Sequence, residues 1–174
     1  RMALLEQLEG VADISDARIL RTVFNLIDAT VRSNFHHRLG QTDFFVAIKI
    51  NSLGVLEMPP PRPLYEIYVH SSDMEAIHLR ASKISRGGIR WSDRVADFRT
   101  EILDLMQTQV SKNALIIPTG AKGGFVVKHR NGSAHAFRQA GQAAYVRFIQ
   151  GLLDLTDNYQ LGSVVSPQGI VAHD

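Results

Sequence analysis

Apolar and polar positions alternate with two different periods along the first half of this chain. In residues 15–38 the apolar side chains recur at helical spacing, which predicts a helix capped by Ser15. Residues 44–50 and 64–70 are rich in β-branched and aromatic side chains, and a proline-rich connector at 58–63 separates them. Residues 76–82 alternate apolar with polar side chains. We therefore expect three strands after the first helix.

The second half mixes the same two patterns. A second helix is expected to start near Ser92, and a third to span residues 133–155. Short apolar runs at 114–118 and 125–128 predict two further strands, with a glycine-rich turn between them. The tail from 157 to 174 is expected to be loop-like. Strands and helices in this order predict an α/β fold, a mixed β-sheet covered by helices. We expect residues 1–43 to form a helical segment packing on a domain of residues 44–174.

Composition narrows the class of protein. The chain has 174 residues, 45% of them hydrophobic and 21% charged, which fits one globular domain. It has no cysteine, so disulfides and thiolate metal sites are excluded. No apolar run is long enough to span a membrane, and the start lacks a signal peptide. A first residue of arginine suggests a piece of a longer protein. Net charge is +2, yet residues 80–130 hold ten Lys/Arg against four Asp/Glu. That excess favours an anionic partner, although a solvated basic face would look the same.

Two diglycines each stand beside a cation, in Arg86-Gly87-Gly88 and in Lys122-Gly123-Gly124. Glycine lets a ligand approach the backbone closely because it has no Cβ. A cation beside it suits a carboxylate or a phosphate. The spacing of a phosphate-binding P-loop is absent, and so is the Gly-x-Gly-x-x-Gly of a dinucleotide site. An RNA-binding arginine-glycine segment would be repetitive, and this one is single.

Two further positions could take part in such a site. Gln109 and Lys112 are three residues apart at the end of the second helix, so they share one face and could hold a carboxylate. The alternative is that Lys112 interacts with the last carbonyls of its helix. Lys122 suits acid–base chemistry near other cations, whereas a turn lysine pointing into water is equally consistent with the pattern. The histidines lack metal-ligand spacing, so no metal site is predicted.

Together these motifs resemble the substrate domain of glutamate dehydrogenases. The resemblance rests on residues 86–90 (RGGIR), on Gln109-x-x-Lys112 and on residues 120–124 (GAKGG). Residues 81–94, which read ASKISRGGIRWSDR, and 97–101, which read DFRTE, are closer still to the large bacterial NAD-specific glutamate dehydrogenases. The match is dense from about residue 64 to the end.

The resemblance implies an oxidoreductase that deaminates L-glutamate: glutamate, NAD and water give 2-oxoglutarate, ammonia and NADH. Lys122 matches the catalytic lysine, which assists water attack on the imino acid and collapse of the carbinolamine. Gln109 and Lys112 match the grip on the α-carboxylate. Arg86 stands where the small enzymes carry a lysine for the side-chain carboxylate. The substrate-binding set implied is Arg86, Gly87, Gly88, Arg90, Gln109, Lys112 and Gly123.

The resemblance also implies what lies outside this chain. NAD would bind to a domain that is not present here, and the catalytic aspartate would follow Asp174. We expect the fragment alone to be inactive and the full-length enzyme to be cytoplasmic and homo-oligomeric, without nucleic-acid or membrane partners. Two alternatives stay open: another amino acid dehydrogenase, of leucine or phenylalanine type, and a non-catalytic anion-binding or oligomerisation module. Three cations near the diglycines favour a diacid substrate.

Overall fold

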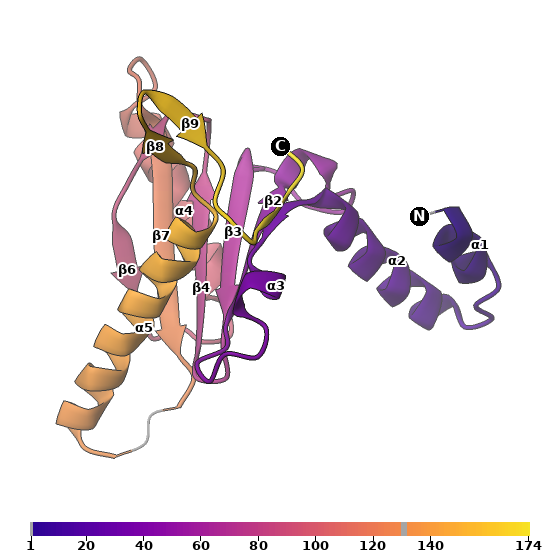
Figure 1. Cartoon of the computed structure of the whole chain (residues 1–174), viewed down its shortest axis with the longest axis horizontal. Coiled ribbons are helices and arrows are strands. Elements are labelled where there is room, and N and C mark those ends of the chain that lie inside the picture. The colour runs from indigo at the N-terminus through magenta and orange to yellow at the C-terminus, as the bar shows by residue number, and fades with distance from the viewer. Residues whose placement is uncertain (1, 130–131) are drawn as a thin grey trace.

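A computed structural model describes residues 2–129 and 132–174, with side chains from Leu5 onward. It is an α/β structure in which one mixed sheet lies between two helices, α4 (Phe98–Lys112) and α5 (Ala134–Asp154) (Figure 1). The predicted fold class is therefore confirmed.

The sheet is antiparallel over most of its width and parallel at one edge. Its strand order is β10-β1-β2-β3-β4-β7-β5, and β6 also pairs with β7. Only β5 and β6 run parallel to β7 among the described strands. The bounds are β1 Thr30–Ser33, β2 Val46–Asn51, β3 Tyr65–His70, β4 Met74–Arg80, β5 Ser85–Arg86, β6 Ile89–Trp91, β7 Thr119–Val127 and β10 Val171–Ala172. The predicted strands at 44–50, 64–70 and 76–82 are confirmed as β2, β3 and β4, within two residues at each end.

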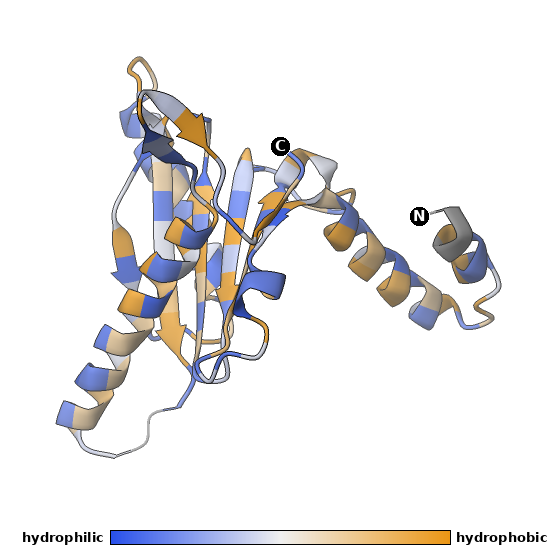
Figure 2. Ribbon diagram, in the orientation of Figure 1, coloured by the Kyte–Doolittle hydropathy of each residue, from blue (hydrophilic) through white to orange (hydrophobic). Residues whose placement is uncertain are grey.

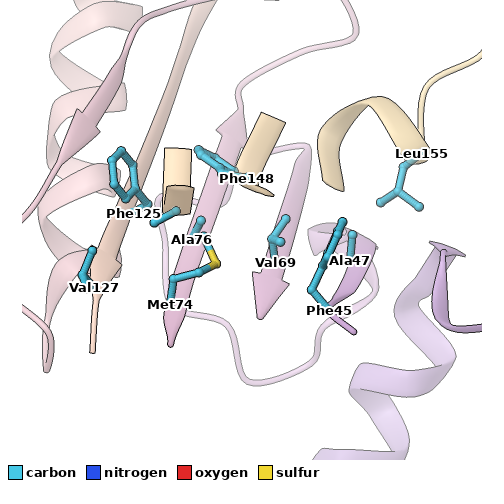
Figure 3. Close-up of a cluster of buried hydrophobic side chains, with 10 residues drawn as sticks. Phe45, Ala47, Val69, Met74, Ala76, Phe125, Val127, Phe148 and Leu155 are labelled. Atoms are coloured by element: carbon cyan, nitrogen blue, oxygen red, sulfur yellow. The ribbon is translucent and has the colours of Figure 1, made fainter. Parts of the chain in front are cut away.

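Each face of the sheet has its own core. On the α5 side, Phe148 is fully buried among Phe45, Val69 and Phe125 (Figure 3). On the α4 side, Ile102 and Met106 of the helix pack on buried residues of β4 and β7. The expected third helix is confirmed, and the Oγ of Ser133 caps it by accepting a hydrogen bond from the N–H of Ala136.

The first predicted helix is correct only in its first part. α1 (Met2–Glu9) precedes α2 (Ile14–Ala29), whose N-cap is Asp13 rather than Ser15. From Thr30 the chain becomes β1, which pairs with β2 and β10, and a short α3 (Phe35–Arg38) follows. Pairing with the sheet thus overrides the helical period. The apolar stripe of α2 extends away from the sheet and stays exposed, with Ile27 66% exposed (Figure 2).

Several expectations in the second half were wrong. α4 begins at Phe98, not near Ser92, because Ile89–Trp91 is extended as β6. Residues 114–118 are not a buried strand: Leu115 is 98% exposed, and the strand starts at Thr119. The glycine-rich segment is therefore no turn, since β7 runs through it without a break. The tail holds a hairpin of β8 (Asn158–Gln160) and β9 (Ser163–Val165) as well as β10, and η1 (Ser52–Gly54) follows β2.

Candidate active site

The glycines of β7 allow α4 to pack directly on the strand. A Cβ built on Gly120 would lie 2.6 Å from the backbone nitrogen of Val110, and one on Gly124 would lie 2.2 Å from Cδ1 of Ile102. Both distances are far below van der Waals contact. Glycine is thus required here for close approach of helix and strand, and not for turn formation.

Lys122 lies between these two glycines and shares their face. Side chains two residues apart in a strand point to the same side, so Lys122 projects from the face that α4 covers. It is paired with Leu79 of β4 in the antiparallel ladder. The central position in a long strand gives its backbone a rigid support.

The first diglycine lies against this part of β7. Gly123 donates its N–H to the carbonyl of Gly88 at 3.0 Å. A Cβ built on Gly87 would lie 1.6 Å from the carbonyl oxygen of Ala121, so only glycine fits there. Gly88 faces the lysine, because a Cβ on it would lie 3.8 Å from Nζ of Lys122. The two diglycines, far apart in sequence, are thus neighbours in the fold.

The remaining predicted residues gather at the same end of the sheet. Gly120 packs on the backbone of Gln109 and Val110, so the last turn of α4 lies beside the start of β7. Arg86 stands opposite Gly120 in the parallel register of β5 and β7, so it points to the α4 side as well. Gln109 is half-buried, whereas Arg86 and Lys112 are exposed. The structure therefore brings Arg86, Gln109, Lys112 and Lys122 to one face.

This face holds positive charge that none of the described residues neutralises. The side chains of Arg86, Lys112 and Lys122 make no ion pair and no hydrogen bond with any described residue. Lys122 stands out further. Of the lysines and arginines in 2–129 and 132–174, it alone is both shielded from full exposure and without a hydrogen-bond or ion-pair partner. A half-buried ammonium group in this state favours an anionic ligand.

Arg90 differs from the other three cations. Its Nε forms an ion pair with Oε1 of Glu101 in the first turn of α4. The second carboxylate oxygen of Glu101 accepts a hydrogen bond from Oγ of Ser92 at 2.6 Å. The expectation that Arg90 binds substrate stays a prediction. Sequence reasoning did not pair Arg90 with Glu101, and their separation of eleven positions offers no signal for it.

The described residues hold neither a metal-binding cluster nor a membrane-spanning helix. No group of three or more His, Asp or Glu is placed so that it could hold a metal ion. None of the helices there has the length and apolar character that crossing a membrane requires.

Comparison with known proteins shows the family of this chain. Residues 3–174 match the family described as bacterial NAD-glutamate dehydrogenase, catalytic domain. The chain is 46% identical over 176 residues to the NAD-specific glutamate dehydrogenase of Pseudomonas aeruginosa, which covers 99% of this chain. It is 45% identical to the enzymes of the same name from Halomonas elongata and Mycobacterium tuberculosis, over 98% and 99% of its length.

The chain belongs to this family, so the resemblance drawn from the motifs is confirmed. It spans only 11% of the length of each of these three relatives.

Proposed function

We propose that this chain is the substrate-binding part of a longer NAD-dependent glutamate dehydrogenase, and that Lys122 is its catalytic lysine. The observation that carries the proposal is the state of Lys122: it is half-buried, it has no side-chain partner among the described residues, and its Nζ lies 3.8 Å from where a Cβ on Gly88 would stand. The names of the relatives supply the reaction class.

Each of the two carboxylates of glutamate would be bound by one of the two exposed cations, Lys112 or Arg86. Gln109 and Lys112, on the last turn of α4, would bind the α-carboxylate through an amide donor and an ammonium group. Arg86, on β5, would bind the side-chain carboxylate, and its planar guanidinium can do so with two parallel hydrogen bonds. Gly87, Gly88 and Gly123 would keep the space between them free of side chains. An apolar substrate of leucine or phenylalanine type would leave Arg86 unpaired, which disfavours that alternative.

Lys122 would lie between these two carboxylate-binding groups, close to the α-carbon of the substrate. Its ammonium group can donate a proton and its amine can accept one, as water attack on the imino acid and collapse of the carbinolamine require.

The glycines of β7 are not arranged as a dinucleotide site requires. A dinucleotide site needs a glycine-rich turn whose free N–H groups meet the pyrophosphate at a helix N-terminus. Here Gly120 and Gly124 are covered by α4, and Gly123 bonds to Gly88. NAD, which accepts the hydride, would be bound by another part of the longer enzyme, and we expect this chain alone to be inactive.

Substrate choice tests the proposal. In the longer enzyme, NAD reduction is measured with L-glutamate and with L-leucine, in wild type and in Lys112→Ala. We expect glutamate to be used and leucine not, and Lys112→Ala to raise KM for glutamate by roughly tenfold or more. Lys83→Ala, which removes an exposed lysine in the β4–β5 loop, is the control. A binding or oligomerisation module would reduce no NAD with either amino acid.

A further inference from the structure

β6 is a short strand beside the candidate site. It has three residues and lies at an edge of the sheet, where it pairs only with β7. Gly88, which faces Lys122, immediately precedes it. A short edge strand frays more readily than a central one, because fewer hydrogen bonds and contacts hold it. Gly88 accepts a hydrogen bond from the N–H of Gly123, and Trp91 of β6 stacks on Phe125, so a contact from α4 would add to these in fixing the strand.

Glu101 supplies that contact from α4. Its carboxylate joins Arg90 within β6 and Ser92 just after it, so it grips the strand at two points. The side chain of Glu101 is only 12% exposed, and Ser92 is 2% exposed. The Oγ of Ser92 also accepts a hydrogen bond from the N–H of Arg94 at 3.1 Å, and the N–H of Ser92 donates to the carbonyl of Phe125 at 2.9 Å. The charge on Glu101 is thus held in a built, largely dry setting.

The same helix carries the opposite wall of the site. Glu101 lies in the first turn of α4, and Gln109 and Lys112 lie in its last turns. The helix is seated on Gly120 and Gly124, which lets it lie close to β7. The Glu101–Arg90 pair therefore links β6, which follows the diglycine, to α4, which carries Gln109 and Lys112.

We infer that Glu101 is a positioning residue of the active site, which acts through Arg90 to hold Gly88 against Lys122. The inference rests on the proposed function, and it gives Arg90 a supporting task in place of contact with the substrate. Catalytic groups must be held to within fractions of an ångström, because a misplacement of about 1 Å can cost on the order of 100-fold in rate.

Kinetics of the longer enzyme test the inference. Glu101→Gln keeps the size of the side chain and its bond to Ser92 but removes the charge that holds Arg90. We expect kcat for glutamate to fall roughly 10- to 100-fold per folded molecule. Asp97→Asn is the matched control: the equivalent change four residues earlier, in a pair with Arg94 that is 3.8 Å long and more than half exposed. It should leave kcat within about twofold. An unchanged kcat in Glu101→Gln would overturn the inference.

Substitution of Arg90 separates support from substrate contact. If Arg90 supports β6, Arg90→Gln should lower kcat as much as Glu101→Gln does, the double variant should be no worse than either, and Arg90→Lys should keep most of the activity. If Arg90 binds a substrate carboxylate, Arg90→Gln should raise KM far more than Glu101→Gln, and the two effects should multiply.

Hydrogen exchange of the present chain gives a readout that does not depend on activity. In Glu101→Gln the amide of Ser92 should exchange at least tenfold faster, while that of Ala76 in β4 should not change. Equal protection of Ser92 in both proteins would contradict the inference even if the proposed function holds. A wild-type enzyme that reduces no NAD with glutamate would end the proposed function, and the exchange result would still decide what holds β6.

Discussion

Gly88 faces the ammonium group of Lys122, and a Cβ in its place would lie 3.8 Å from Nζ. This distance is an ordinary van der Waals contact, so the fold itself tolerates a methyl group there. The free space beside Lys122 is thus a property of the site and not a requirement of packing.

The two residues of the first diglycine should therefore respond differently to alanine. Gly88→Ala should leave the melting temperature nearly unchanged but reduce kcat for glutamate, because its methyl group occupies the space beside Lys122. Gly87→Ala should unfold the edge of the sheet, since its Cβ would lie 1.6 Å from the carbonyl oxygen of Ala121. We expect a loss of about 1–3 kcal/mol or more. Calorimetry of Gly87→Ala and Gly88→Ala measures the change in stability, and steady-state kinetics measures the change in kcat. A stable Gly87→Ala protein would contradict the packing at β5 and β6.

Arg32 ties the first strand to the end of the chain. Its side chain is 8% exposed and bonds to Asp157, to Asp174 and to the carbonyl of Leu155. Arg32→Ala would leave Asp157 without its arginine partner and Asp174 with Lys49 alone, so we expect a loss of roughly 3–5 kcal/mol in the free energy of unfolding. Arg18→Ala is the control, because its pair with Glu57 is long and exposed and should cost less than about 1 kcal/mol. Urea titrations of both variants measure the difference. Equal losses would show that the buried network adds nothing.

The same network should make stability depend on acid. The hydrogen bond from Arg32 lowers the pKa of Asp157. For Asp174, burial raises the pKa, but the hydrogen bonds from Lys49 and Arg32 outweigh it and leave the pKa below its usual value. A lowered folded pKa means that the stabilisation is present above about pH 4 and is lost as the pH falls further. Part of the acid sensitivity below pH 4 should thus disappear in Arg32→Ala.

His78 should lower the free energy of unfolding in a less acidic range, between pH 6.5 and 4. Burial on the α5 side of β4, and secondly the charge of Arg80, lower its pKa from 6.5 to about 4. Between pH 6.5 and 4 the imidazole takes up a proton in the unfolded chain but not in the folded one. The free energy of unfolding therefore decreases as the pH is lowered from 6.5 to 4. The full effect is on the order of 3 kcal/mol. His78→Gln should flatten the stability profile in this window, and His135→Gln, an exposed control, should not. A wild-type profile that is flat from pH 6.5 to 4 would refute this.

The sequence predicted the sheet better than the site's geometry, for physical reasons. The strands β3 and β4 were found because residues 64–70 are rich in β-branched and aromatic side chains and residues 76–82 alternate apolar with polar ones. The run from Gly120 to Gly124 looks like a turn because glycine is common in turns. Here it serves close helix packing, which depends on where α4 lies and is not visible locally. Likewise Thr30 continues a helical pattern, and only pairing with β2 makes it a strand.

For the candidate site, the sequence identified the residues but not their partners. The motifs identified Arg86, Gln109, Lys112 and Lys122 as cations and donors, and the fold places them on one face. Which cation is free depends on partners distant in sequence. Arg90 and Lys122 look alike beside their glycines, yet Glu101 neutralises the first and nothing among the described residues neutralises the second.

The most direct test of the account is the rate of glutamate-dependent NAD reduction by the longer enzyme carrying Lys122→Met. Methionine keeps the length of the side chain and removes the ammonium group. The account predicts a fall in kcat of about 10³-fold or more, with a melting temperature close to wild type, because Lys122 makes no structural bond in the described chain. Lys83→Met should keep wild-type activity. A Lys122→Met enzyme that retains its kcat would contradict the central claim.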